Sequence, residues 1–215
     1  MKKGLTEMVM ILDASGSMYG LTKDTIGGYN SMIDRQRREE GEALVSLVTF
    51  NDTSTVLCDR IPIEKVEPLS ERQYVAAGCT ALIDAIGGAI HHISNVHKYI
   101  RNEDVPEHTL FVIITDGMEN ASRRYSSDQV KKKISEKEKE GWEFIFLGAN
   151  IDAVQTASSF GIRRENAVDF ICDEVAMPKV MRSVSNAMSS MRQGNAQVNA
   201  GWAEEVRADY KKRKR

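Results

Sequence analysis

Five oxygen-bearing side chains of this sequence have types and spacings suited to a hard divalent cation. Asp13, Ser15 and Ser17 form a D-x-S-x-S pattern, and Thr80 and Asp116 stand further along the chain. Mg²⁺ prefers oxygen ligands in an octahedron at about 2.0–2.1 Å and keeps several waters. The three hydroxyls could bind the ion directly, while the two carboxylates bind it or hold its waters. A shell rich in neutral hydroxyls leaves much of the ion's charge available, which favours a carboxylate from another molecule.

Buried strands are the elements that would bring these residues together. Four short apolar segments, rich in β-branched and aromatic residues, are typical of central strands covered on both faces. They are residues 8–12, 43–50, 110–114 and 142–147. A fifth segment, residues 167–172, is weaker. A sixth, residues 53–61, follows the turn signal Asn51-Asp52 and predicts an antiparallel edge strand.

Helical periodicity separates these strands and defines the fold class. The predicted helices are residues 21–40, 81–100, 126–140, 152–160 and 174–192. Strands that alternate with helices form right-handed crossovers. We therefore expect an α/β fold: a Rossmann-like, doubly wound, mostly parallel six-stranded sheet with one antiparallel edge strand and helices on both faces. Ligands of such sheets bind at the carboxyl ends of the strands, where the five residues are expected to meet.

The same residues carry a resemblance to a known family. The segment Asp13-Ala14-Ser15-Gly16-Ser17, together with Thr80 and Asp116-Gly117, resembles the metal-ion-dependent adhesion site (MIDAS) of von Willebrand factor A (vWA) domains. The likeness covers residues 5–192, and it is nearest to stand-alone members of the bacterial and phage type. It implies that Ser15, Ser17 and Thr80 coordinate Mg²⁺, with Asp13 and Asp116 assisting through water; Mn²⁺ or Ca²⁺ could replace it.

Function depends on the open position that such an ion would keep. The resemblance implies a cation-dependent, adhesion-type module that binds a protein partner through an Asp or Glu carboxylate. One alternative is a metal-assisted hydrolase or phosphatase, in which Ser15 or Ser17 is a nucleophile or the metal activates water. The sequence has no G-x-S-x-G elbow, no P-loop, and no histidine or lysine placed by a motif as general base. We therefore predict no enzyme and assign no catalytic residue.

Composition sets the remaining expectations. The chain has 215 residues, 41% of them hydrophobic and 28% charged, as is ordinary for a globular protein. We expect a vWA domain over residues 1–193 and a C-terminal tail over residues 194–215. The net charge is −2, and the last five residues, 211–215, are all basic. The overall balance argues against nucleic acid, although an assembly or nucleic-acid factor that acts through the basic tail stays an alternative.

Cysteine usage and hydropathy predict the compartment. Three separated cysteines, Cys58, Cys79 and Cys172, form no C-x-x-C pair and indicate free thiols in a reducing environment. No apolar run reaches the roughly 18 residues of a membrane span, and residues 8–12 are too short for the core of a signal peptide. We therefore expect a cytoplasmic protein that makes no contact with a membrane.

Overall fold

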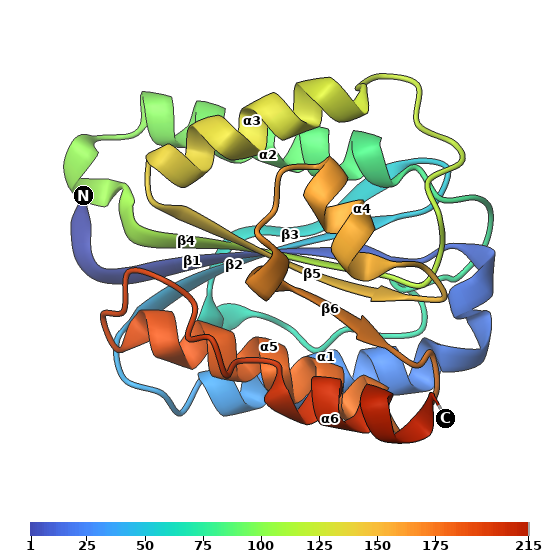
Figure 1. Cartoon of the computed structure of the whole chain (residues 1–215). Coiled ribbons are helices and arrows are strands. Elements are labelled where there is room, and N and C mark those ends of the chain that lie inside the picture. Colours follow the sequence, from blue (N-terminus) through green and yellow to red (C-terminus); the bar gives the residue numbers. More distant parts are fainter. Residues whose placement is uncertain (215) are drawn as a thin grey trace.

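One six-stranded sheet forms the middle layer of the chain in a computed structural model that describes residues 1–214 (Figure 1). The strand order is β3-β2-β1-β4-β5-β6. All neighbours pair in parallel except β2 and β3, which are antiparallel. The predicted fold class, including the antiparallel edge strand, is confirmed. The strands are β1 (Lys2–Asp13), β2 (Glu42–Phe50), β3 (Ser54–Pro62), β4 (Pro106–Thr115), β5 (Trp142–Ala149) and β6 (Ala167–Phe170).

Helices cover both faces of the sheet, as Figure 1 shows. Buried side chains of α2, α3 and α4 form one apolar core with one face, and those of α1, α5 and α6 form a second core with the other. Two-sided burial explains why the central strands read as continuous apolar runs rather than as alternating ones. The helices are α1 (Thr22–Gln36), α2 (Leu82–Tyr99), α3 (Ser127–Lys139), α4 (Ala153–Ser159), α5 (Met177–Arg192) and α6 (Glu204–Arg213).

Two strands begin earlier than their apolar runs do. β1 starts at Lys2 rather than at residue 8, and β4 starts at Pro106 rather than at residue 110. The polar part of β1 is tolerated because the fully buried Glu7 is paired: its carboxylate accepts from Arg60 Nε and lies against His97 Nε2, each at 2.6 Å. A buried charge with two hydrogen-bonded partners avoids most of the desolvation cost that hydropathy alone would assign to it.

Close packing of α1 on α5 explains Gly28, the second glycine of the Gly27-Gly28 pair in α1. A Cβ on Gly28 would lie 2.8 Å from Cγ of Met181, so only glycine allows this approach. The apolar stripe of α5 faces this contact and the sheet, as the spacing of its methionines predicts. All five of its residues are at most 1% exposed; they are Met177, Met181, Val184, Met188 and Met191.

The C-terminal segment packs against the domain. Trp202 is 3% exposed, and its indole Nε1 donates to the carbonyl of Glu165 at 3.2 Å. α6 contacts both α5 and β6. The boundary between residues 193 and 194 stays a prediction, but most of the segment after it lies on the fold rather than away from it. Of the basic run, residues 211–214 are described, whereas Arg215 lies outside the described residues.

None of the helices described over residues 1–214 combines the length and the apolar character that crossing a bilayer requires.

Candidate metal site at the carboxyl edge of the sheet

Three loops at the carboxyl edge carry the five predicted residues. Asp13 is the last residue of β1, and Ser15 and Ser17 come after it at the start of a 3₁₀ helix (Gly16–Leu21). Asp116 directly follows β4, which neighbours β1 in the sheet. Thr80 lies in the loop that leads into α2. The strand order therefore places the two carboxylates side by side, as expected for neighbouring parallel strands.

Direct hydrogen bonds connect these loops. The hydroxyls of Ser15 and Ser17 lie 3.0 Å apart, and Ser17 Oγ donates to Asp116 Oδ1 at 2.6 Å. Thr80 reaches the same space: a Cβ on Gly117 would lie 3.1 Å from Thr80 Oγ1 and 3.9 Å from Ser17 Oγ. The structure therefore brings the hydroxyls of Ser15 and Ser17 and the Asp116 carboxylate together, with the Thr80 hydroxyl close by at Gly117.

Asp13 is held from behind rather than from the open side. Its Oδ2 accepts from Thr115 Oγ1 at 2.5 Å and its Oδ1 from the Ser15 amide at 2.7 Å, and the side chain is fully buried. Burial raises the pKa of the Asp13 carboxyl, and the charge of Asp116 adds to that rise, whereas the hydrogen bonds from Thr115 and Ser15 oppose it. Two neighbouring buried carboxylates create a negative site that a cation would relieve.

Backbone bonds fix the loops relative to one another. Gly16 N donates to Gly78 O at 3.0 Å, and Ala77 N donates to Ala14 O at 2.9 Å, so the first loop and the loop before α2 are joined twice. Thr80 N donates to the side-chain oxygen of Asn120 at 2.9 Å, and Asn120 N donates back to the Thr80 carbonyl at 3.0 Å. These bonds hold in place the backbone segments that carry the hydroxyls of the site.

Glu119 and Asn120 come after Asp116-Gly117, and the sequence left open whether they contact a partner or only shape a turn. Glu119 accepts from the backbone amides of Ile83, Ala121 and Ser122. Its carboxylate thus satisfies the Ile83 amide at the start of α2, which would otherwise lack a partner, and two amides of its own loop. The hydrogen bonds of both residues favour the structural interpretation.

Sequence reasoning missed two residues that touch the site carboxylates. Thr115 orients Asp13 through its hydroxyl, and its place at the end of a buried strand could have indicated an inward side chain. Cys172, just after β6, donates from Sγ to Asp116 Oδ2 at 3.5 Å. Burial raises the pKa of the Cys172 thiol, and the charge of Asp116 adds to this, so the thiol stays protonated as a donor.

The donor set decides which metals fit. Within residues 1–214, no group of three or more His, Cys, Asp or Glu side chains could hold a metal ion. A cation at this edge would instead rest on hydroxyls and two carboxylates, all hard oxygen donors. In the described part of the chain Thr80 Oγ1 makes no hydrogen bond, so it is available as a ligand. These residues fit a hard divalent cation.

Solved structures with a similar fold are vWA domains. No protein-family model and no curated protein sequence matches the chain. One such structure is proximal thread matrix protein 1 (PTMP1) from the mussel byssus, with a zinc-occupied MIDAS motif. The match covers 84% of this chain and 44% of PTMP1, at 19% identity and a TM-score of 0.56. A second match is a von Willebrand factor type A protein from Catenulispora acidiphila. It covers 86% of this chain and 42% of that protein, at 13% identity and a TM-score of 0.55.

A third match is the manganese-loaded TRAP protein of Plasmodium vivax, with 84% of this chain and 73% of that protein covered at 15% identity and a TM-score of 0.53. This chain spans less than half the length of PTMP1 and of the Catenulispora protein. The chain has the vWA fold.

Proposed function

We propose that this chain is a divalent-cation-dependent protein-binding module, in which Mg²⁺ sits on Ser15, Ser17 and Thr80 and is assisted by Asp13 and Asp116. The observation that carries the proposal is the meeting of Ser15, Ser17 and Asp116 within hydrogen-bond distance, with Thr80 beside them. A bound ion would supply an unfilled coordination position for a carboxylate. The partner would present an Asp or Glu there.

Two of the structural neighbours support a divalent cation at such a site. PTMP1 holds zinc in its MIDAS motif, and TRAP is loaded with manganese. We propose Mg²⁺ for this chain because hydroxyls and carboxylates are the donors that it prefers, with Mn²⁺ or Ca²⁺ as substitutes.

Apolar side chains around the site support a macromolecular partner. Four of the large, exposed hydrophobic residues lie on the loops at this edge: Tyr19 and Met118 each follow a site residue by two positions, and Val75 and Val175 come from the loops before α2 and α5. They are 50–77% exposed. Grouped exposed apolar residues are typical of interaction sites, and here they would surround the cation.

The chain's own residues would do the positioning. Thr115 and the Ser15 amide fix the Asp13 carboxylate, which would assist the ion through water, and Cys172 holds one oxygen of Asp116 while the other accepts from Ser17. The loops joined by backbone hydrogen bonds keep these groups in place before any partner arrives, which lowers the entropic cost of binding.

The surroundings of the serines support a role without catalysis. Ser15 and Ser17 bond to each other and to Asp116, whereas His92 and His97 pair with Asp59 and Glu7 elsewhere. Among the described residues, no histidine or lysine bonds to either serine, and the base within hydrogen-bond reach of Ser17 is the Asp116 carboxylate, whose charge a bound cation would offset.

The described part of the basic tail is partly engaged within the fold. Arg213 pairs with Asp173 and Asp209, and Lys214 lies over the ring of Tyr210. This reduces the charge that is free for nucleic acid, and it supports a partner site at the sheet edge rather than at the tail.

The cytoplasmic location remains part of the proposal. It rests on Cys58, Cys79 and Cys172, which are all free thiols in the structure. Free thiols persist in reducing compartments.

Calorimetric titration of the EDTA-stripped protein with Mg²⁺ and Mn²⁺ tests the site. We expect one-site binding, of about millimolar strength, in the parent and none in Ser15→Ala/Ser17→Ala. Ser158→Ala/Ser159→Ala, which removes two hydroxyls at the far end of α4, should bind like the parent. Repeating the titration with acetate or glutamate should tighten metal binding if a carboxylate completes the shell. Absence of binding in the parent under every one of these conditions would overturn the proposal.

A further inference from the structure

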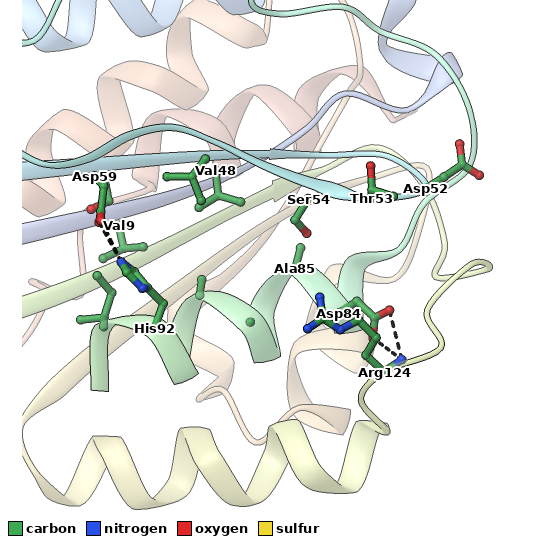
Figure 2. A pocket seen from close by; sticks show the side chains of 15 residues that line it. Val9, Val48, Asp52, Thr53, Ser54, Asp59, Asp84, Ala85, His92 and Arg124 are labelled. Carbon is green, nitrogen blue, oxygen red and sulfur yellow. Dashed lines mark hydrogen bonds and ion pairs between the residues drawn. The ribbon is translucent and has the colours of Figure 1, made fainter. Parts of the chain in front are cut away.

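We propose a second binding site, lined by none of the five residues of the metal site, that takes a small monocarboxylic acid with an apolar body. The site is a pocket of about 270 Å³ between α2 and the β2–β3 edge of the sheet (Figure 2). Its volume is slightly below the usual range for ligand pockets, roughly 300–1,000 Å³, which indicates a small ligand.

The floor of the pocket is apolar and reaches down to the sheet. Val9 and Val48 are 1% and 6% exposed, and Ala85 and Ala89 line the pocket from α2. Small side chains on this face of α2 leave the space open: a Cβ on Gly88 would meet no atom within 4 Å. A ligand body lying here would bury apolar surface on both sides.

Three carboxylates line the pocket, and each is already hydrogen-bonded to another group of the protein. Asp84 accepts from the backbone amides of Arg123, Arg124 and Tyr125 at 2.8–3.2 Å. Asp59 holds His92 Nε2 with both oxygens, at 3.0 and 2.9 Å, and this pair closes one end of the pocket (Figure 2).

The third carboxylate is also bonded. Asp52 accepts from the Cys79 amide at 3.1 Å, so its Oδ2 is directed out of the pocket toward the loop before α2.

Unused hydrogen-bond donors lie at the other end. Figure 2 shows the Arg124 side chain in the pocket, with Thr53 and Ser54 opposite on the strand side. Within residues 1–214, the Arg124 guanidinium makes no hydrogen bond or ion pair, and neither do the hydroxyls of Thr53 and Ser54. A planar guanidinium binds a carboxylate through two parallel hydrogen bonds, and the hydroxyls can add to them.

Charge decides between a carboxylate and a phosphate. Asp52, Asp59 and Asp84 keep their negative charge even where they are hydrogen-bonded, and Arg124 is the one lining cation that is charged at every ordinary pH. A dianionic phosphate would meet about twice the repulsion from these carboxylates that a monoanion meets, so a monoanion is the anion that one guanidinium holds best. The head group is therefore a carboxylate at Arg124, and the apolar body extends over Gly88 toward His92.

Titration with two probe acids, hexanoate and phenylacetate, tests this site by two-dimensional ¹H–¹⁵N NMR, with hexanamide as the uncharged analogue. We expect at least one acid to shift resonances of α2 and of the β2–β3 edge, and hexanamide to bind at least about tenfold more weakly. EDTA should leave these shifts unchanged, because the site does not depend on the metal.

Matched variants separate the head group from the body. Arg124→Gln should weaken binding at least about tenfold, whereas Arg123→Gln, its neighbour outside the pocket, should not. Gly88→Leu should fill the pocket and abolish binding, whereas Gly27→Leu, at an equally open position on α1, should not. The proposal is overturned if neither acid shifts pocket resonances at up to about 10 mM, or if Arg124→Gln binds like the parent.

Discussion

Replacing Trp202 by alanine should reduce the free energy of unfolding by about 3–5 kcal/mol, the usual cost of removing a large aromatic side chain from a core. The indole is 3% exposed and belongs to the apolar core that α1, α5 and α6 form with the sheet. Trp202→Phe should cost much less, about 1 kcal/mol, because it keeps most of the apolar contact and loses one hydrogen bond. That bond ends on the carbonyl of Glu165, which also accepts from Arg207 Nη2 at 2.6 Å and so stays satisfied.

Urea denaturation followed by far-ultraviolet circular dichroism measures both variants. Tyr99→Ala is the control, because Tyr99 is 77% exposed, and its loss should change stability by less than about 0.5 kcal/mol. If Trp202→Ala also costs less than about 1 kcal/mol, residues 194–214 do not dock, and the tail expected from the sequence is the correct description. A loss of the size expected for a core aromatic residue would mean that α6 unfolds together with the rest of the domain.

Three further perturbations test local features. Asp84→Asn should destabilise the protein by about 1–3 kcal/mol at pH 7. Burial raises the pKa of Asp84, but hydrogen bonds from three backbone amides outweigh it and the pKa is lowered. This stabilisation is therefore complete above the pKa of the unfolded state, about 3.9, and is lost as the pH falls through the lower pKa of the folded state. Urea titrations at pH 7 and below pH 3 should show that the stability difference between the variant and the parent shrinks at the lower pH. Gly78→Ala should lower the melting temperature, since φ is +78° and the added Cβ would lie 1.9 Å from Asp52 Oδ2; an unchanged value would contradict the strain. Glu7→Gln should cost about 3 kcal/mol in chemical denaturation, because it leaves Arg60 without its buried partner, and a loss below 1 kcal/mol would mean that water reaches the pair.

Much of the sheet was predictable because its interior is covered on both faces. The continuous runs in β1, β2, β4 and β5 contain almost every fully buried strand residue. The ends of these strands were not predictable, because buried polar residues such as Glu7 are paired with side chains far away in the sequence. Arg60 lies 53 residues from Glu7 and His97 lies 90 residues from it. No local pattern reports such pairs.

The packing of residues 194–214 on the domain was not predicted from the sequence, for a related reason. Residues 194–203 have weak periodicity, and α6 is strongly charged. Its attachment depends on a few apolar anchors, such as Trp202 and Val206, and on the ion pairs Lys179–Asp209 and Arg182–Glu205 with α5. A helix that docks through isolated anchors and charge pairs has no amphipathic signature.

At the candidate site, the sequence indicated the residue types, whereas the backbone determines their orientation. The D-x-S-x-S pattern and the two later positions sufficed to predict which side chains share the edge, because strand order alone brings their loops together. It could not show that Thr115 would hold Asp13 or that Cys172 would contact Asp116, since both depend on where neighbouring strands end in space. Nor could it show that the loops before α1 and α2 are joined by two backbone hydrogen bonds. Those bonds make the position of the hydroxyls a property of the folded backbone. We therefore predict that a cation would find Ser15, Ser17 and Asp116 already close together, and would displace the hydrogen bonds among them rather than move the loops.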